Sequence, residues 1–293
     1  MAVPNNPYPA LQRAVDPALV RNIRQASQSS STDFGLLMAQ AAQESGFKPD
    51  AKSAGGSAAG LFQFIDSTWL DMVHRFGAKY GAGDLASQIS VSAAGKPEVA
   101  DPATRQRILA LRSDPALSAS LAGEYAKLNK DEVERALGHG VGAADVYMAH
   151  FLGAGGATQF LRALESDGAT PAADLLPDAA ANNRGVFYDG ATGRAKSVAE
   201  IYRTLGGRIE QQANDFAGLA GDGDAVQGDM NETLPASGGA APSVSRRFDF
   251  AGLHLSQPVA AMLDTLTLVA LRIVNGGGAQ AAHPRRSDTP AGT

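Results

Sequence analysis

Residues 33–45 read DFGLLMAQAAQES, and residues 46–60 continue as GFKPDAKSAGGSAAG. The apolar residues of the first stretch recur at helical spacing, which predicts a helix that is capped by Ser31 or Thr32 and ends at Gly46. The second stretch is rich in Gly, Ala and Ser, which predicts a loop. This helix and its loop decide how the rest of the sequence is interpreted.

Glu44 is expected to project from the apolar face of this helix, because it follows Leu37 and Ala41 at intervals of four and three. A carboxylate is unusual on an apolar helix face. The alternative interpretation is that Glu44 is exposed to solvent, as most lone glutamates on helices are. A carboxyl group held among apolar side chains loses hydration, which favours its protonated form. Such a group can donate a proton near neutral pH.

The composition favours a mainly α protein. The 293 residues are rich in Ala, and aromatic residues make up only 6%. The net charge is -5 and no run of Lys and Arg is present, so we expect no nucleic-acid surface. The absence of Cys excludes disulfides, thiolate metal sites and Cys nucleophiles. No metal-binding or cofactor-binding motif is visible, and we expect neither group.

Helix-start signals recur along the chain. Asp-Pro pairs at positions 16, 101 and 114 each place a capping side chain before a proline suited to the first turn. Ser197 and Glu200 form a capping box that opens a helix to about residue 217. Other helices are expected at about 17–29, 102–112, 115–128, 131–137 and 143–152, the last ending at Gly153, and from near Ile65 through Met72.

The chain is expected to divide into a catalytic domain, a linker and a terminal helix. The domain covers residues 1–217, with a motif core at 31–165. Residues 218–250 are acidic and rich in Gly, Ala and Ser, which predicts a flexible linker. A short amphipathic helix at 251–275 and a disordered tail at 276–293 complete the chain. No secretion signal and no membrane span are expected from the sequence.

A set of motif residues at fixed spacing runs from the end of this helix through the loop and beyond it: Glu44-Ser45, Ser53, Gly60-Leu61-Phe62-Gln63 and Thr68-Trp69. Over residues 34–75 the sequence resembles the soluble lytic transglycosylase family, the bacterial enzymes that cut the glycan strands of peptidoglycan. Phe62 stands where the family usually has Met.

The resemblance implies a lysozyme-like helical domain with a groove for a glycan chain. It implies that Glu44 is the single catalytic acid and then the base. Ser45 and Ser53 would lie near the acetamido group of the substrate. Gln63 would line the groove, and Phe62 and Ile65 would pack beside a sugar ring.

A second resemblance to the family lies at Ala149–Ala157, where the family usually has Ala-Tyr-Asn-Ala-Gly before a Gly-containing turn. Here His150 aligns with the Tyr and Phe151 with the Asn, which is a departure. In the family the tyrosine hydroxyl holds the catalytic carboxyl group. A neutral His150 could do the same, whereas a charged His150 would favour the deprotonated carboxylate and hinder an acid catalyst. Tyr147, one turn earlier, could also supply a hydroxyl, and packing is the alternative role for both residues.

Other carboxylates near the motif have ordinary structural interpretations. Asp50 is expected in a turn, Asp66 as the cap of the next helix, and Asp71 on the solvated side of that helix. Trp69 lies at apolar helical spacing and is expected in the core. Without a second carboxylate in a partner motif, the pattern favours a one-carboxylate mechanism.

The sequence therefore predicts a peptidoglycan lytic transglycosylase that cleaves the β-1,4 bond between N-acetylmuramic acid and N-acetylglucosamine, with glycan strands as its partner. The alternatives are a hydrolytic muramidase and a non-catalytic glycan-binding module of a phage tail or export machine. We expect a location in the bacterial cell envelope, in the periplasm, or else association with a phage or a secretion system. The helix at 251–275 is expected to contact an export-machinery or envelope protein.

Overall fold

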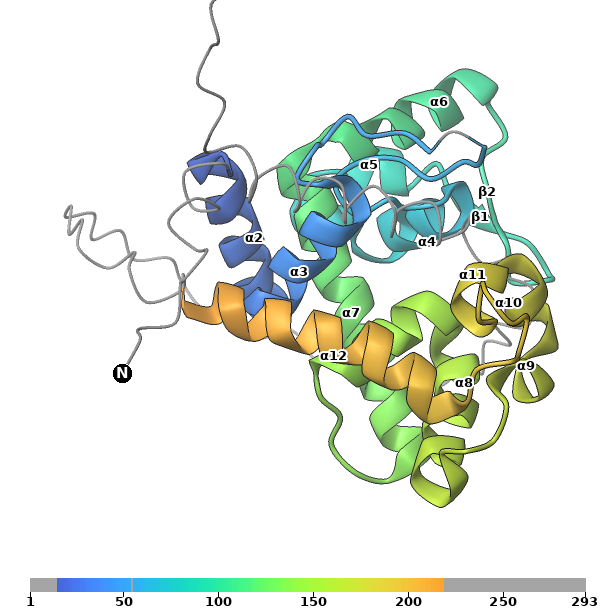
Figure 1. The fold of residues 1–293 in the computed structure, drawn as a ribbon. Coiled ribbons are helices and arrows are strands. Elements are labelled where there is room, and N and C mark those ends of the chain that lie inside the picture. The colour runs from blue at the N-terminus through green and yellow to red at the C-terminus, as the bar shows by residue number, and fades with distance from the viewer. Residues whose placement is uncertain (1–14, 54, 219–293) are drawn as a thin grey trace, which may run out of the picture.

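Helix α3 (Phe34–Ser45) packs against three other helices in the computed structural model, which describes residues 15–53 and 55–218 (Figure 1). These partners are α2 (Pro17–Ser30), α7 (Pro115–Leu137) and α12 (Val198–Ala217). Ten residues of α3 are buried, among them Glu44. A helix that is apolar on nearly every side must lie inside a protein, as this one does.

The Asp-Pro pairs start three helices, as the sequence predicts. Asp16 accepts a hydrogen bond from the backbone N–H of Ala18 at 2.8 Å at the start of α2. Asp101 caps α6 (Pro102–Ala110), and Asp114 caps α7. Each carboxylate satisfies backbone donors that have no partner inside the helix.

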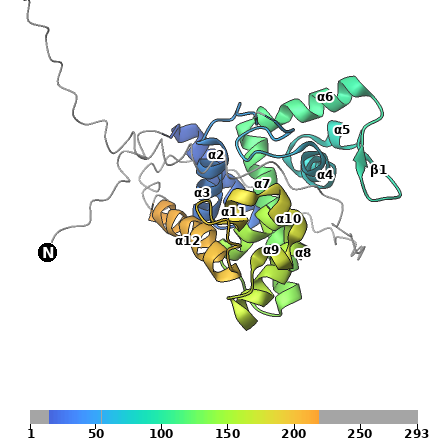
Figure 2. The same ribbon diagram turned by 45° about the vertical axis from the view of Figure 1, so that its right-hand side comes forward.

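The remaining elements are mostly short. They are α4 (Asp66–Phe76), η1 (Gly77–Tyr80), α5 (Gly83–Ala86), β1 (Ser90–Val91), β2 (Pro97–Glu98), η2 (Leu111–Ser113), α8 (Ala143–Asp167), α9 (Ala172–Leu175), α10 (Pro177–Asn182) and α11 (Arg184–Phe187). The two strands form an antiparallel pair with Ser90 opposite Glu98 and Val91 opposite Pro97. Figure 2 shows α4, α5, α6 and β1 gathered on one side of α7, with α8 to α11 on another. The described residues are thus mainly helical.

One hydrophobic cluster runs through the described residues, from Val15 to Phe216. Trp69 is fully buried in it, and its indole N–H donates to the carbonyl oxygen of Ile108 at 2.7 Å. The prediction that Trp69 belongs to the core is therefore confirmed.

The structure corrects one helix prediction. Residues 115–128 and 131–137 belong to one helix, α7, rather than two. Ion pairs of Lys127 with Asp131 (2.7 Å) and of Lys130 with Glu134 (2.9 Å) span the expected break and support the helix there. The helix that begins at residue 143 breaks at Gly153, as the sequence predicts, because Gly153 has non-helical dihedral angles; a further helical stretch then follows as far as Asp167.

Helices α3 and α12 approach each other closely at Gly35. A Cβ atom placed on Gly35 would lie 2.1 Å from the carbonyl oxygen of Ala213. The absence of a side chain at this position therefore allows the backbones to meet, and α12 covers the helix that carries Glu44.

Apart from Gly218, the predicted linker (218–250), the terminal helix (251–275) and the tail (276–293) lie outside the described residues. Within residues 15–53 and 55–218, no helix combines the length and the apolar character needed to cross a bilayer.

We expect Gly35→Ala to destabilise the protein by about 1–3 kcal/mol, because the added methyl group would force α12 away from α3. Gly207→Ala is the matched control, since Gly207 is exposed in the middle of α12 and a Cβ there meets nothing within 4 Å. The control should be up to about 1 kcal/mol more stable than the wild type. Urea unfolding followed by circular dichroism measures both changes, and equal effects of the two substitutions would contradict the close packing.

We expect the capping box of α12 to make stability depend on acid pH. Hydrogen bonds from Arg194 and from the backbone N–H of Ser197 lower the pKa of Glu200 to about 2. A folded-state pKa below the unfolded value, about 4.3, stabilises the folded state above that value, and this stabilisation is lost as the pH falls toward about 2. Glu200→Gln should therefore lower Tm at pH 7, and the difference from wild type should shrink between about pH 4 and pH 2. The same Tm difference at both pH values would contradict this, and Glu210→Gln, exposed on the same helix, serves as the control.

Candidate functional site

Glu44 lies in the last turn of α3 and is 9% exposed. The helix ends at Gly46, which adopts the left-handed conformation that the sequence predicts. It begins at Asp33, whose carboxylate accepts from the backbone N–H of Leu36 at 2.6 Å. The cap is therefore neither Ser31 nor Thr32, because Ser31 instead ends α2 in the left-handed conformation.

His150 is the side chain within ion-pairing distance of the Glu44 carboxyl group. Its Nε2 lies 3.3 Å from Oε1 of Glu44. The imidazole comes from α8, more than a hundred residues after α3 in sequence. The packing of α7 on α8 and of α12 on both α3 and α8 brings the two groups together.

Two tyrosine rings hold the imidazole of His150. Tyr147 stacks on it, with centroids 6.1 Å apart and planes at 27°. Tyr125, from α7, meets it edge-on, with centroids 6.1 Å apart and planes at 73°. No motif in the sequence indicates Tyr125, because it joins the site only through the packing of α7 against α8.

Burial keeps both tyrosines protonated. It raises the pKa of Tyr147 well above the usual value, and the neighbouring Glu44 charge raises it further. Burial likewise raises the pKa of Tyr125. The Gln43 side chain donates to the Tyr147 hydroxyl and so fixes the phenol from α3. Both phenols therefore remain hydrogen-bond donors at neutral pH.

The helix that carries His150 is interrupted three residues later. Gly153 has φ 72° and ψ 157°, a conformation that strongly favours glycine. His150 thus lies in the turn just before the break, and the chain beyond it resumes as the second half of α8.

The loop after Glu44 folds back on itself through backbone hydrogen bonds. Ser53 N–H donates to Ala58 O at 3.0 Å, Gly60 N–H to Ala51 O at 2.8 Å, and Ala59 N–H to Phe64 O at 3.1 Å. Within this loop Gln63 has a φ of 46°, which costs a non-glycine residue about 1–3 kcal/mol. Surrounding contacts must compensate for this strain.

The Gln63 side chain is part of this compensation. It is 7% exposed, and its Nε2 donates to the carbonyl oxygens of Gly60 (2.9 Å) and Ala51 (3.2 Å). The structure therefore places the amide nitrogen against the loop backbone.

The two motif serines make local hydrogen bonds. Ser45 Oγ donates to Ala41 O at 3.1 Å and accepts from the Lys48 N–H. Ser53 Oγ accepts from the Gly56 N–H at 3.1 Å, which leaves its own proton available to another acceptor.

The two apolar motif residues differ in exposure. Phe62 is buried in the core with 3% exposure, whereas Ile65 is half-buried. Of the two, Ile65 has the more accessible side chain.

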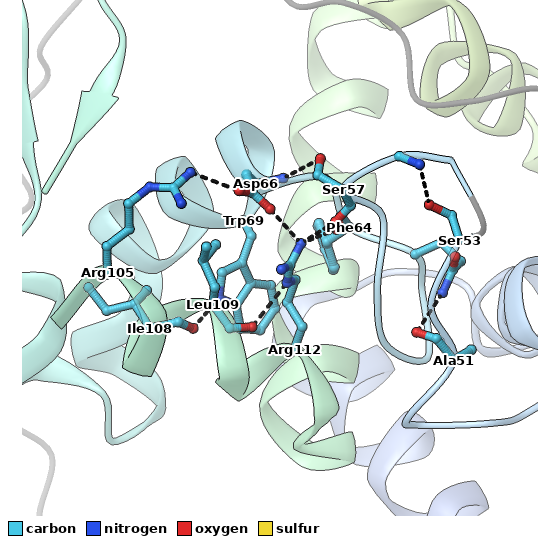
Figure 3. Close-up of polar contacts among 12 residues, drawn as sticks. Ala51, Ser53, Ser57, Phe64, Asp66, Trp69, Arg105, Ile108, Leu109 and Arg112 are labelled. Carbon is cyan, nitrogen blue, oxygen red and sulfur yellow. Dashed lines mark hydrogen bonds and ion pairs between the residues drawn. The ribbon is translucent and has the colours of Figure 1, made fainter. Parts of the chain in front are cut away.

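Asp66 does not cap α4, contrary to the sequence-based prediction. The cap position is Ile65, which provides no side-chain hydrogen bond. The Asp66 carboxylate instead accepts from Arg105 at 2.7 Å and from Arg112 at 2.9 Å (Figure 3). It acts as the counter-ion of two arginines that follow it by about 40 residues.

Asp71 is less solvated than the sequence suggests. It lies on α4, burial raises its pKa, and Arg75 lies 3.6 Å away. Its charge also acts on Tyr125. In the part of the chain that the structure describes, no group of three His, Cys, Asp or Glu side chains could hold a metal ion.

Comparison with known families places part of the chain in a described domain family. Residues 21–94 match the family model described as the transglycosylase SLT domain. The match includes Glu44, its loop and α4, and it confirms the resemblance seen in the sequence. Together with the mainly helical structure, it indicates a lysozyme-like domain. It supports a peptidoglycan-acting function of the lytic transglycosylase type in general.

We expect Tyr147 to remain protonated until the protein unfolds in alkali, because burial raises its pKa well above the usual value. The ultraviolet titration curves of wild type and Tyr147→Phe should then coincide up to the onset of unfolding, which circular dichroism detects. Loss of one tyrosine from the titration of folded Tyr147→Phe near pH 10, the usual pKa of a phenol, would contradict the expectation.

Proposed function

We propose, from the match of residues 21–94 to the transglycosylase SLT domain, that the protein is a peptidoglycan lytic transglycosylase that uses Glu44 as its acid and then its base. The substrate bond is the β-1,4 linkage between N-acetylmuramic acid and N-acetylglucosamine. The observation that carries the proposal is the position of Glu44. It lies inside the matched region, is buried at the end of α3 and has the imidazole of His150, from outside that region, beside it.

In the first step Glu44 transfers its proton to the glycosidic oxygen, and the bond from that oxygen to C1 of the muramic acid breaks. General acid catalysis of this kind contributes about 10²–10⁴-fold to a rate. Positive charge develops at C1, and the acetamido oxygen of the same sugar shields it, as in substrate-assisted glycosidases. The burial of the Glu44 side chain in the last turn of α3 supports this role.

In the second step the Glu44 carboxylate takes the proton from the 6-hydroxyl of the muramic acid. The oxygen then bonds to C1, and a 1,6-anhydro ring closes. No water is consumed, and Glu44 is again protonated for the next cycle. One carboxylate therefore suffices, in contrast to glycosidases that need two.

His150 is proposed to hold the Glu44 carboxyl group in place. A neutral imidazole with its proton on Nε2 donates to the carboxyl oxygen, as a hydroxyl group would. The 3.3 Å separation supports this assignment, and the rings of Tyr125 and Tyr147 keep the imidazole oriented.

The other motif residues are proposed to contact the glycan. Ser53 has a hydroxyl proton available for the acetamido oxygen, and Ile65 has an accessible apolar side chain for a sugar ring. Ser45, Phe62 and Gln63 make mostly internal contacts, so we propose that they shape the substrate site as well as touch the glycan.

A hydrolytic muramidase is the second candidate, and the position of His150 favours it. An imidazole beside the catalytic carboxyl group can accept a proton from water as well as donate to Glu44. Water would then attack C1 in place of the 6-hydroxyl.

The proposed location is the bacterial cell envelope, in the periplasm, because the substrate lies there. The match supports a cell-wall-acting, envelope-related protein in general. A contact of residues 251–275 with an export-machinery or envelope protein is a further proposal about a segment outside the described residues.

We expect Glu44→Gln to lower glycan release at least about 100-fold while the protein stays folded, because the amide has no acidic proton to give. Soluble muropeptides released from purified sacculi measure the activity, and circular dichroism measures the fold. Glu165→Gln, an exposed glutamate paired with His139, is the matched control and should keep full activity. Substantial activity of Glu44→Gln would remove Glu44 from its central role.

Mass spectrometry of the released fragments distinguishes the candidate reactions. A transglycosylase yields 1,6-anhydro ends, which lack one water relative to the reducing ends that a muramidase yields. Exclusively reducing ends would establish hydrolysis. Tight binding to glycan strands without any released fragment would instead indicate a binding module.

A further inference from the structure

Arg112 reaches from η2, between α6 and α7, into the loop that precedes α4. Its Nη1 donates to Ser57 O at 2.6 Å and to Phe64 O at 3.0 Å, and it lies 2.9 Å from Oδ1 of Asp66 (Figure 3). Its Nε donates to Leu109 O at 3.0 Å. The side chain is only 10% exposed. One cation therefore joins both arms of the loop at residues 57–66, and Asp66 balances its charge.

The backbone of Arg112 also meets this loop. A Cβ atom on Gly60 would lie 2.1 Å from the carbonyl oxygen of Arg112, and Gly60 has a φ of 83°. The loop thus lies directly against η2 and contacts both the main chain and the guanidinium of Arg112.

The strained residue of the loop lies next to a carbonyl that Arg112 holds. Gln63 is in the left-handed conformation, and the carbonyl of the following residue, Phe64, accepts from both Arg112 and the Ala59 N–H. Strained residues persist where their surroundings over-determine them. Arg112 supplies one of these restraints from outside the loop.

A series of contacts leads from the loop to Glu44. The ring centroids of Phe64 and Tyr125 lie 6.2 Å apart, and those of Tyr125 and His150 lie 6.1 Å apart. His150 in turn lies 3.3 Å from Glu44. A shift of Phe64 would therefore release the ring that orients the imidazole beside the carboxyl group.

We infer that Arg112 is a positioning residue for the reaction at Glu44, which it serves by holding residues 57–66 in their strained shape. The inference rests on the proposed function for its catalytic part. It goes beyond that function because Arg112 lies outside the matched region of 21–94 and in no motif of the sequence.

The substitution Arg112→Lys tests whether the hydrogen bonds of Arg112 hold residues 57–66 in shape. Lysine keeps the positive charge for Asp66, but its side chain is shorter than that of arginine and it lacks the Nε–H that donates to Leu109 O, so its ammonium group does not reach the positions of both Nε and Nη1. Arg105→Gln is the matched control, since Arg105 pairs with the same carboxylate from α6 and is 38% exposed. Three quantities are measured for each protein: Tm, the amide hydrogen exchange of residues 57–66, and kcat and KM for glycan release.

We expect Arg112→Lys to speed exchange in residues 57–66 while exchange in α12 stays as in the wild type. Its kcat should fall by up to about 100-fold, the scale of a small misplacement of reacting groups. KM should rise as well, because Phe62, Gln63 and Ile65 lie in the same loop and are proposed to contact the glycan, so kcat at saturating glycan is the readout for the geometry at Glu44. Arg105→Gln should resemble the wild type in exchange, kcat and KM.

Two results would overturn the inference. Unchanged amide hydrogen exchange of residues 57–66 in Arg112→Lys would show that Arg112 does not hold the loop in shape. Faster exchange with wild-type kcat, or a loss of activity that only follows the fraction unfolded, would show that the loop shape does not serve catalysis. Failure of the proposed function gives a different result, because the wild type itself would then release no glycan. That result would also overturn the positioning role of Arg112, whatever the exchange data show.

Discussion

The burial of helix α3 on nearly every side fixes the position of Glu44. The helix is surrounded by α2, α7 and α12, and the contact at Gly35 brings α12 against its backbone. A helix enclosed in this way cannot slide or rotate without opening the packing around it. The carboxyl group in its last turn therefore has a defined position before any substrate arrives.

The same packing assembles the rest of the site from distant parts of the chain. Tyr125 comes from α7 and His150 from α8; His150 meets Glu44, and Tyr125 meets His150 where these helices pack together. Because an imidazole and a carboxyl group are costly to bury alone, each provides a partner for the other. Burial raises the pKa of both tyrosines, so their phenols stay protonated beside this pair.

Local signals in the sequence predicted most helix starts, and the end of α3, correctly. The Asp-Pro pairs, Gly46 and the Ser197–Glu200 box act within one helical turn, so a short stretch of sequence contains all the information. Predictions failed where tertiary contacts decided the outcome. Asp66 looks like a cap in sequence, but two arginines from α6 and η2 bind it instead.

The same distinction applies to the site. The motif around Glu44 could be recognised because its residues are close in sequence, and the match at 21–94 confirms the family resemblance. Tyr125 and Arg112 carry no such signal, since their partners lie on other elements. Their contacts exist only once the helices have packed.

The hydrogen bonds that Arg112 makes to the loop have a consequence for divergence. Its two loop acceptors are main-chain oxygens, of Ser57 and Phe64, and every amino acid has such an oxygen. Side chains at many loop positions can therefore be exchanged during evolution or in a mutant library without removing those acceptors. The exposed residues 55–57 should then tolerate most amino-acid substitutions. Arg112 should tolerate few substitutions, although it lies some fifty positions away in the sequence.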